Sequence, residues 1–210
     1  MLIKSSIFSL FRSAPSKSVS WSLWDDKFLI SQIPPEWFPL RNRKFWWCAH
    51  YSLKAVIEWK NRQNYPIEHY SADRWSWKTY LMTPWWILKV LKKYKLKYSV
   101  IKVKKLSENE KLILLKENLK RGPIILLVAN WQTRKSRFLW WKALTHWHYV
   151  SLWWYDDEKM IFYVYDSNTK KQTLQNDMKW TLKVPYKYIL KEWWIWASKL
   201  VYNFAIAIRY

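Results

Sequence analysis

The stretch HYVSLWWYDDEKMIFYVYD, residues 148–166, carries most of the information on the fold. Both of its arms are rich in β-branched and aromatic residues, and the polar run at 156–158 supplies a turn between them, so the stretch predicts a β-hairpin. The two arms are equally long on either side of residue 157. Strand pairing alone therefore predicts that His148, which begins the hairpin, lies beside Asp166, which ends it.

Cys48, the only cysteine in the chain, stands at the start of a predicted helix. The segment CAHYSLKAVIEW (48–59) has apolar residues at helical spacing, and Pro34 and Pro35 keep the segment before it extended. The positive end of a helix dipole and its free N–H groups favour a thiolate, as a nucleophile requires. The alternative is that Cys48 is only a small buried hydrophobic residue, which is the commoner role of a lone cysteine.

The remaining pattern favours an α+β fold, in which an N-terminal helical part packs against a C-terminal antiparallel sheet. Thr83-Pro84 is a typical helix start, Ser107 and Glu110 form a capping box, and Gly122-Pro123 ends a helix. The predicted helices span 48–59, 83–96 and 107–121, and the predicted strands span 97–105, 124–130, 148–155, 159–166 and 204–210.

Length and composition describe one globular domain. The chain has 210 residues, of which half are hydrophobic and a quarter are charged, and we expect a mobile tail over 1–24 and a single domain over 25–210. No apolar run reaches the roughly 20 residues of a transmembrane helix, and the N-terminus is thin for a secretory signal. These features favour a soluble, cytoplasmic protein without an internal disulfide.

The net charge of +22 raises the question of a polyanionic partner. The 37 basic residues are scattered through predicted helices and strands instead of forming one motif, so we interpret them as a lysine-biased solvated surface. This distribution argues against nucleic acid as the partner. A basic, aromatic-rich surface that binds nucleic acid or an anionic membrane stays open as an alternative.

Three segments together resemble the C39-like branch of the papain-fold peptidases, and the resemblance extends over roughly residues 25–210. It implies a papain-like cysteine peptidase fold in which Cys48 is the nucleophile, His148 is the base and Asp166 orients that base. The three segments are WWCAHYSLKAVIEW (46–59), RGPIILLVAN (121–130) and THWHYVSLWWYDDEKMIFYVYDSN (145–168).

Two positions near the cysteine depart from the pattern of that family. The family has a glutamine six residues before the cysteine to help bind the oxyanion, and this chain has Asn42 there. Asparagine can donate the same hydrogen bond but reaches less far. The family also prefers Gly-Pro after the cysteine, where this chain has Ala49-His50. We therefore expect Asn42 and the backbone N–H of Cys48 to form the oxyanion site.

The expected activity is hydrolysis of a peptide or amide bond through a thioester, on a peptide or protein substrate and without a cofactor. The histidines and carboxylates show no recognised metal spacing, so no metal is expected. We expect His50 to be exposed on its helix, His146 to face away from His148, and His69 to lie in a loop. A papain-fold binding module that has lost turnover is the main alternative.

The ratio of glycine to tryptophan is abnormal. About 7% glycine is usual, which would give roughly 15 residues, yet the chain has one glycine and 20 tryptophans. Several tryptophans stand where turns usually place glycine, such as Trp85 and Trp86 after Pro84 and Trp154 before a polar turn. We hypothesise that most of them are glycines encoded by UGA codons, read here as tryptophan; a tryptophan-rich binding protein is the alternative.

This hypothesis makes a prediction about the gene. We expect UGA codons at Trp147 and Trp154, and tryptic peptides from the native organism whose masses correspond to glycine at these positions. Sequencing of the gene and mass spectrometry of the native protein measure both. UGG codons at Trp147 and Trp154 would exclude recoding.

Overall fold

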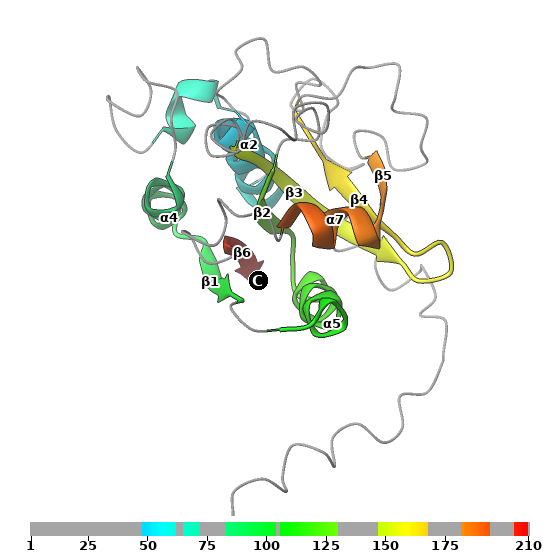
Figure 1. The fold of residues 1–210 in the computed structure, drawn as a ribbon. Helices are drawn as coiled ribbons and strands as arrows, with labels where there is room; N and C mark the ends of the chain where they lie inside the picture. Colours follow the sequence, from blue (N-terminus) through cyan, green and yellow to red (C-terminus); the bar gives the residue numbers. More distant parts are fainter. Residues whose placement is uncertain are drawn as a thin grey trace, which may run out of the picture.

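The computed structural model describes residues 48–61, 65–71, 83–103, 106–129, 147–167, 182–193 and 204–209. Its strands form one six-stranded sheet in the order β1-β6-β2-β3-β4-β5, and each neighbouring pair is antiparallel (Figure 1). The elements are α2 (Cys48–Asn61), the 3-10 helix η4 (Ile67–Tyr70), α4 (Pro84–Lys93), β1 (Lys97–Lys102), α5 (Glu108–Leu119), β2 (Ile124–Ala129), β3 (Trp147–Asp156), β4 (Ile161–Tyr165), β5 (Leu182–Pro185), α7 (Tyr186–Trp193) and β6 (Phe204–Arg209).

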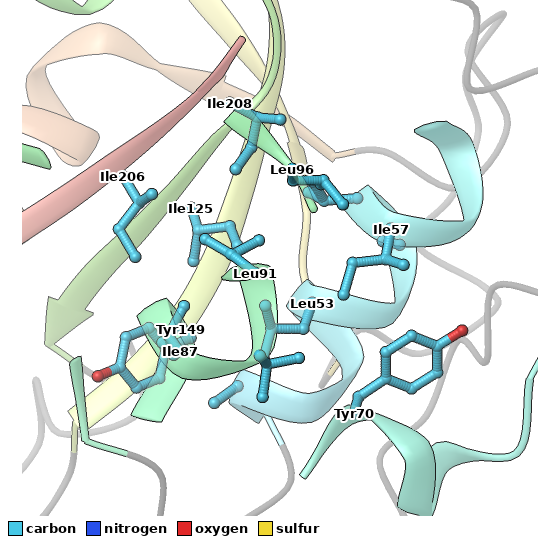
Figure 2. Packing of buried hydrophobic residues seen from close by; sticks show 14 of the residues in the cluster. Leu53, Ile57, Tyr70, Ile87, Leu91, Leu96, Ile125, Tyr149, Ile206 and Ile208 are labelled. Atoms are coloured by element: carbon cyan, nitrogen blue, oxygen red, sulfur yellow. The ribbon is translucent and has the colours of Figure 1, made fainter. Parts of the chain in front are cut away.

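Helices pack against both faces of the sheet. Successive strand residues point to opposite faces, so each strand can contribute side chains to both cores. In β2, Ile125 and Leu127 pack with α2 and α4, whereas Ile124 and Leu126 pack with α5 and α7. Figure 2 shows the first of these cores, where Leu53 and Ile57 of α2 and Ile87 and Leu91 of α4 meet the sheet residues Ile125, Tyr149, Ile206 and Ile208.

Local sequence signals explain where the helices begin. Pro84 is the first residue of α4, a position at which its missing N–H costs no hydrogen bond. At the start of α5, the Ser107 hydroxyl accepts a bond from the Glu110 backbone N–H, and the Glu110 carboxylate accepts one from the Ser107 N–H at 2.8 Å. This is the capping box that the sequence predicts.

The predicted mixture of helices and antiparallel strands is confirmed, and the expected elements appear with small shifts at their ends. The separation into a helical part and a sheet is incomplete, because β1 precedes α5 and α7 follows β5. The expected tail over 1–24 lies outside the described residues. None of the helices in the described part of the chain is both long and apolar enough to cross a lipid bilayer.

The sequence pattern predicts no element over 182–193, where the structure has β5 and α7. β5 is only four residues long and ends in proline, and no capping signal precedes α7, so both are held by tertiary contacts. The Tyr186 hydroxyl donates to the Asp156 carbonyl at 2.9 Å and lies 2.9 Å from an Asp157 carboxylate oxygen. These bonds connect α7 to the β3–β4 turn.

The described tryptophans that were interpreted as glycine-like positions have ordinary backbone conformations. Trp85 and Trp86 lie in α4, and Trp154 lies in β3. Among the described non-glycine residues, positive φ occurs at Lys95 and Met160 instead. These three tryptophans therefore sit where no left-handed conformation is required, and the recoding hypothesis depends on composition and on the gene.

Gly122 is a position where the backbone demands glycine. Its φ is +150°, and a Cβ placed on it would come within 2.3 Å of the Ile208 carbonyl oxygen in β6. We expect Gly122→Ala to lower the free energy of unfolding by about 1–3 kcal/mol, measured by urea denaturation. The exposed neighbour gives a control, Arg121→Ala, whose expected effect is within about 0.5 kcal/mol. Equal effects of the two substitutions would contradict the prediction.

Candidate active site

The described part of α2 begins at Cys48, and α2 packs against β3. The residues before Cys48 lie outside the described residues, so the position of Cys48 at the N-terminus of the helix, which would favour negative charge, stays a prediction. The Cys48 residue is 7% exposed. The structure therefore places this cysteine in a site that is largely shielded from water.

The β3–β4 hairpin contains a bulge at Trp153. Leu152 pairs with Val164 and Trp154 pairs with Tyr163, so Trp153 is an extra residue in β3. The clusters of buried side chains agree, since Trp153 packs in the core with α2, whereas Leu152 and Tyr155 both pack in the core on the other face and leave Trp153 and Trp154 between them. Two successive residues on one face are what a bulge produces in a strand that otherwise alternates.

This bulge decides which face Asp166 shares. Extending the Ser151–Tyr165 pair by one residue sets Asp166 opposite Val150, so Asp166 and His148 are diagonal neighbours on one face. If the register of the outer hairpin continued past the bulge, the relation would invert and the two side chains would face opposite sides. His148 and Asp166 therefore lie side by side, as expected from the sequence, but the register is shifted by two positions from that of a hairpin symmetric about residue 157.

The position of the turn explains the shift in the register of the hairpin. The structure has its turn at 157–160, with Met160 at a φ of 53°, and not at 156–158. Asp156 still pairs with Ile161, and its carboxylate accepts a bond from the Lys159 N–H at 3.0 Å. The later turn shifts the register, and the bulge then restores the shared face.

The three predicted catalytic side chains meet in the structure. His148 Nε2 donates to Asp166 Oδ1 at 2.7 Å, and the Cys48 side chain lies within hydrogen-bonding reach of the imidazole. Because Nε2 is bonded to the carboxylate, Nδ1 is the nitrogen left to face the sulfur. Asn42, the fourth predicted site residue, lies outside the described residues.

The electrostatics of this group favour a protonated imidazole. Burial alone would lower the pKa of His148, but the charge of Asp166 and its hydrogen bond, together with the contact to Cys48, raise that pKa to about 10. Burial, and to a lesser extent the charge on the Cys48 sulfur, raises the pKa of Tyr149. An imidazolium between a carboxylate and a thiolate is the charge state in which all three groups are paired.

His50 differs from its expected position. It was expected on the exposed side of α2, but it is fully buried, and its Nε2 lies 3.0 Å from the Ser71 hydroxyl oxygen. Burial lowers the pKa of His50 to about 4, so its ring is neutral near pH 7. His69 lies in η4, where its ring stacks on Tyr65. His146 lies outside the described residues.

Two further residues near the site were not singled out from the sequence. The Ser52 hydroxyl donates to the Tyr149 carbonyl at 3.1 Å and so links α2 to the residue after His148. Ser52 follows Cys48 by four residues, which places both on one helix face, and that spacing is the signal that could have identified it. Among the described residues, no group of three or more His, Cys, Asp or Glu side chains could hold a metal ion.

The fold is similar to that of a solved peptidase domain. The structure titled as the peptidase domain of Streptococcus ComA, a bifunctional ABC transporter of a quorum-sensing pathway, matches with a TM-score of 0.53. The two sequences are 14% identical over 82% of this chain and 98% of that chain. No family model and no curated protein matches the sequence. The likeness supports the C39-like fold that the sequence resemblance implies.

The raised pKa of His148 gives a testable pH dependence. The His148–Asp166 pair stabilises the folded protein fully below pH 6.5, and this contribution is lost as pH rises through about 10. In Asp166→Asn, burial is opposed by the contact with Cys48 but no longer by the larger effect of the Asp166 charge and its hydrogen bond, so the titration midpoint of His148 should fall by about 1–3 pH units. NMR of labelled histidine measures both midpoints. The exposed turn variant Glu158→Gln should leave the midpoint unchanged, and an unchanged midpoint in Asp166→Asn would refute the assignment.

Proposed function

We propose that this chain is a cysteine-dependent hydrolase of the C39-like, papain type that cleaves a peptide or amide bond. The proposal rests on one arrangement of side chains. The Cys48 thiol lies beside the His148 imidazole, and Asp166 accepts a hydrogen bond from that imidazole at 2.7 Å. Nucleophile, base and orienting group in this order are the requirements of acyl transfer by a thiol. The similarity of the fold to a peptidase domain adds support.

In the proposed first step, the Cys48 thiolate attacks the carbonyl carbon of the scissile bond, and the carbonyl becomes an oxyanion. The His148 imidazolium gives its proton to the leaving amine as the C–N bond breaks, which leaves a thioester on Cys48. Neutral His148 then takes a proton from water, and the resulting hydroxide attacks the thioester. The acid product leaves and the thiolate–imidazolium pair is restored.

Asp166 has an orienting role in this scheme. Its bond to Nε2 keeps Nδ1 directed at the sulfur and stabilises the imidazolium at the start of each cycle. The oxyanion is assigned to the Cys48 backbone N–H, on the expectation that Cys48 stands at the N-terminus of α2, and to the side chain of Asn42. The role of Asn42 follows from the family resemblance alone.

A second candidate function is supported by a different surface. Trp85 is 67% exposed on α4, and the Lys102 ammonium lies 5.9 Å from the centre of its ring. An exposed aromatic ring beside lysines is suited to stacking on a base or to insertion at an anionic membrane surface. This function predicts binding that weakens steeply with added salt, which a titration at several salt concentrations measures.

The hydrolase proposal predicts the behaviour of two variants. Cys48→Ala and His148→Ala should each lower kcat/KM on a peptide substrate by about 10⁴-fold or more, because each removes a group that bonds to the reacting atoms or transfers a proton. Cys48→Ala should also lose labelling by iodoacetamide. A fluorogenic peptide library and mass spectrometry of the labelled protein provide the two measurements.

The control for the histidine variant is His69→Ala, which changes an exposed residue of η4 and should retain full activity. Full activity in Cys48→Ala would refute the proposal. A wild-type protein that is labelled at Cys48 but cleaves no peptide would instead identify a binding module that has kept the fold and lost turnover.

A further inference from the structure

We infer that Ser52 is a positioning residue that sets the separation between the Cys48 sulfur and the His148 ring, an inference that rests on the proposed function. Its hydroxyl donates to the Tyr149 carbonyl at 3.1 Å, and the Ser52 residue is fully buried. Ser52 lies one helical turn after Cys48, and Tyr149 directly follows His148. The bond therefore connects the two elements that carry the reacting groups.

The place of this bond in the sheet explains why it matters. The pairing of β3 with β4 ends at Ser151 and Tyr165, whereas the pairing with β2 continues to Trp147. In the described part of the sheet, the His148 end of β3 is thus paired along one edge only. The Tyr149 carbonyl lies in this stretch, and the Ser52 hydroxyl holds it from the helix side.

Other polar bonds of α2 lead in a different direction. His50 contacts Ser71, and the buried Glu58 carboxylate accepts bonds from the Tyr65 N–H at 2.9 Å and from the Tyr70 hydroxyl at 2.5 Å. These bonds join α2 to the segment that contains η4. The bond of Ser52 instead joins α2 to β3.

A hydrogen bond between two short, stiff segments constrains distance closely. Four helical residues separate Ser52 from Cys48 by about 6 Å of rise, and a single peptide unit joins Tyr149 to His148. A shift of the Tyr149 carbonyl would therefore be passed to the imidazole almost unchanged. A displacement of about 1 Å in a catalytic pair lowers the rate by about 100-fold.

Ser52→Ala removes the hydroxyl without adding volume, and we expect it to lower kcat by about 10- to 100-fold while KM changes by less than about 2-fold. The rising acid limb of the pH profile of Cys48 alkylation by iodoacetamide should move to higher pH, because a weaker contact with the His148 imidazolium stabilises the thiolate less. Ser52→Thr keeps a hydroxyl and should restore most of both properties.

The matched control is Ser71→Ala, which removes another buried serine hydroxyl that contacts α2, on the side of η4. The Ser71 hydroxyl oxygen lies 3.0 Å from His50 Nε2, away from the reacting groups, so its loss should lower thermal stability while kcat stays within about 2-fold. Ser52→Ala with reduced stability and unchanged kcat and alkylation profile would overturn the inference.

The alkylation profile keeps this test separate from the proposed function. If the wild-type protein cleaves no peptide, the hydrolase proposal fails, yet a displaced alkylation profile in Ser52→Ala still supports the positioning role. If the wild type is active and Ser52→Ala matches it in kcat and alkylation, positioning by Ser52 fails and the hydrolase proposal stands.

Discussion

A buried imidazole held by a buried carboxylate is the interaction on which the candidate site depends. His148 and Asp166 are both less than a tenth exposed and are 2.7 Å apart. Neither charge would be stable alone in that position, because an unpaired ion in a poorly solvated site is strongly destabilising. The pair therefore has to form together, and its formation fixes the nitrogen that faces Cys48.

Three parts of the fold cooperate to bring this pair and the thiol together. The sheet supplies β3 and β4, the bulge at Trp153 gives His148 and Asp166 a common face, and α2 brings Cys48 to the end of β3 that carries His148. The bulge residue is itself fixed, since its ring meets Trp59 of α2 edge-on with centroids 5.8 Å apart. The same helix thus contacts both the reacting end and the bulge of this strand.

Much of the site could be predicted from local sequence, although its geometry could not. The helix that contains Cys48 follows from helical spacing, and the hairpin follows from two β-prone arms around a polar turn. Local signals fail at β5 and α7, which are short, uncapped and held by Tyr186 against the β3–β4 turn. They also fail for His50, because the amphipathic pattern of α2 does not reveal that η4 covers its polar side.

The sequence by itself determined which side chains are available and which elements present them, namely a cysteine that begins a helix and a histidine and an aspartate at the two ends of one hairpin. Helix starts and hairpin turns depend on residues close in the chain, so a single sequence contains that information. The tertiary structure decided the register of that hairpin and the bond from Ser52 to the Tyr149 carbonyl. The bond joins segments about 100 residues apart in the chain, so local sequence does not contain it. The register depends on the bulge in β3, and a one-residue change of register reverses the face of every side chain beyond it.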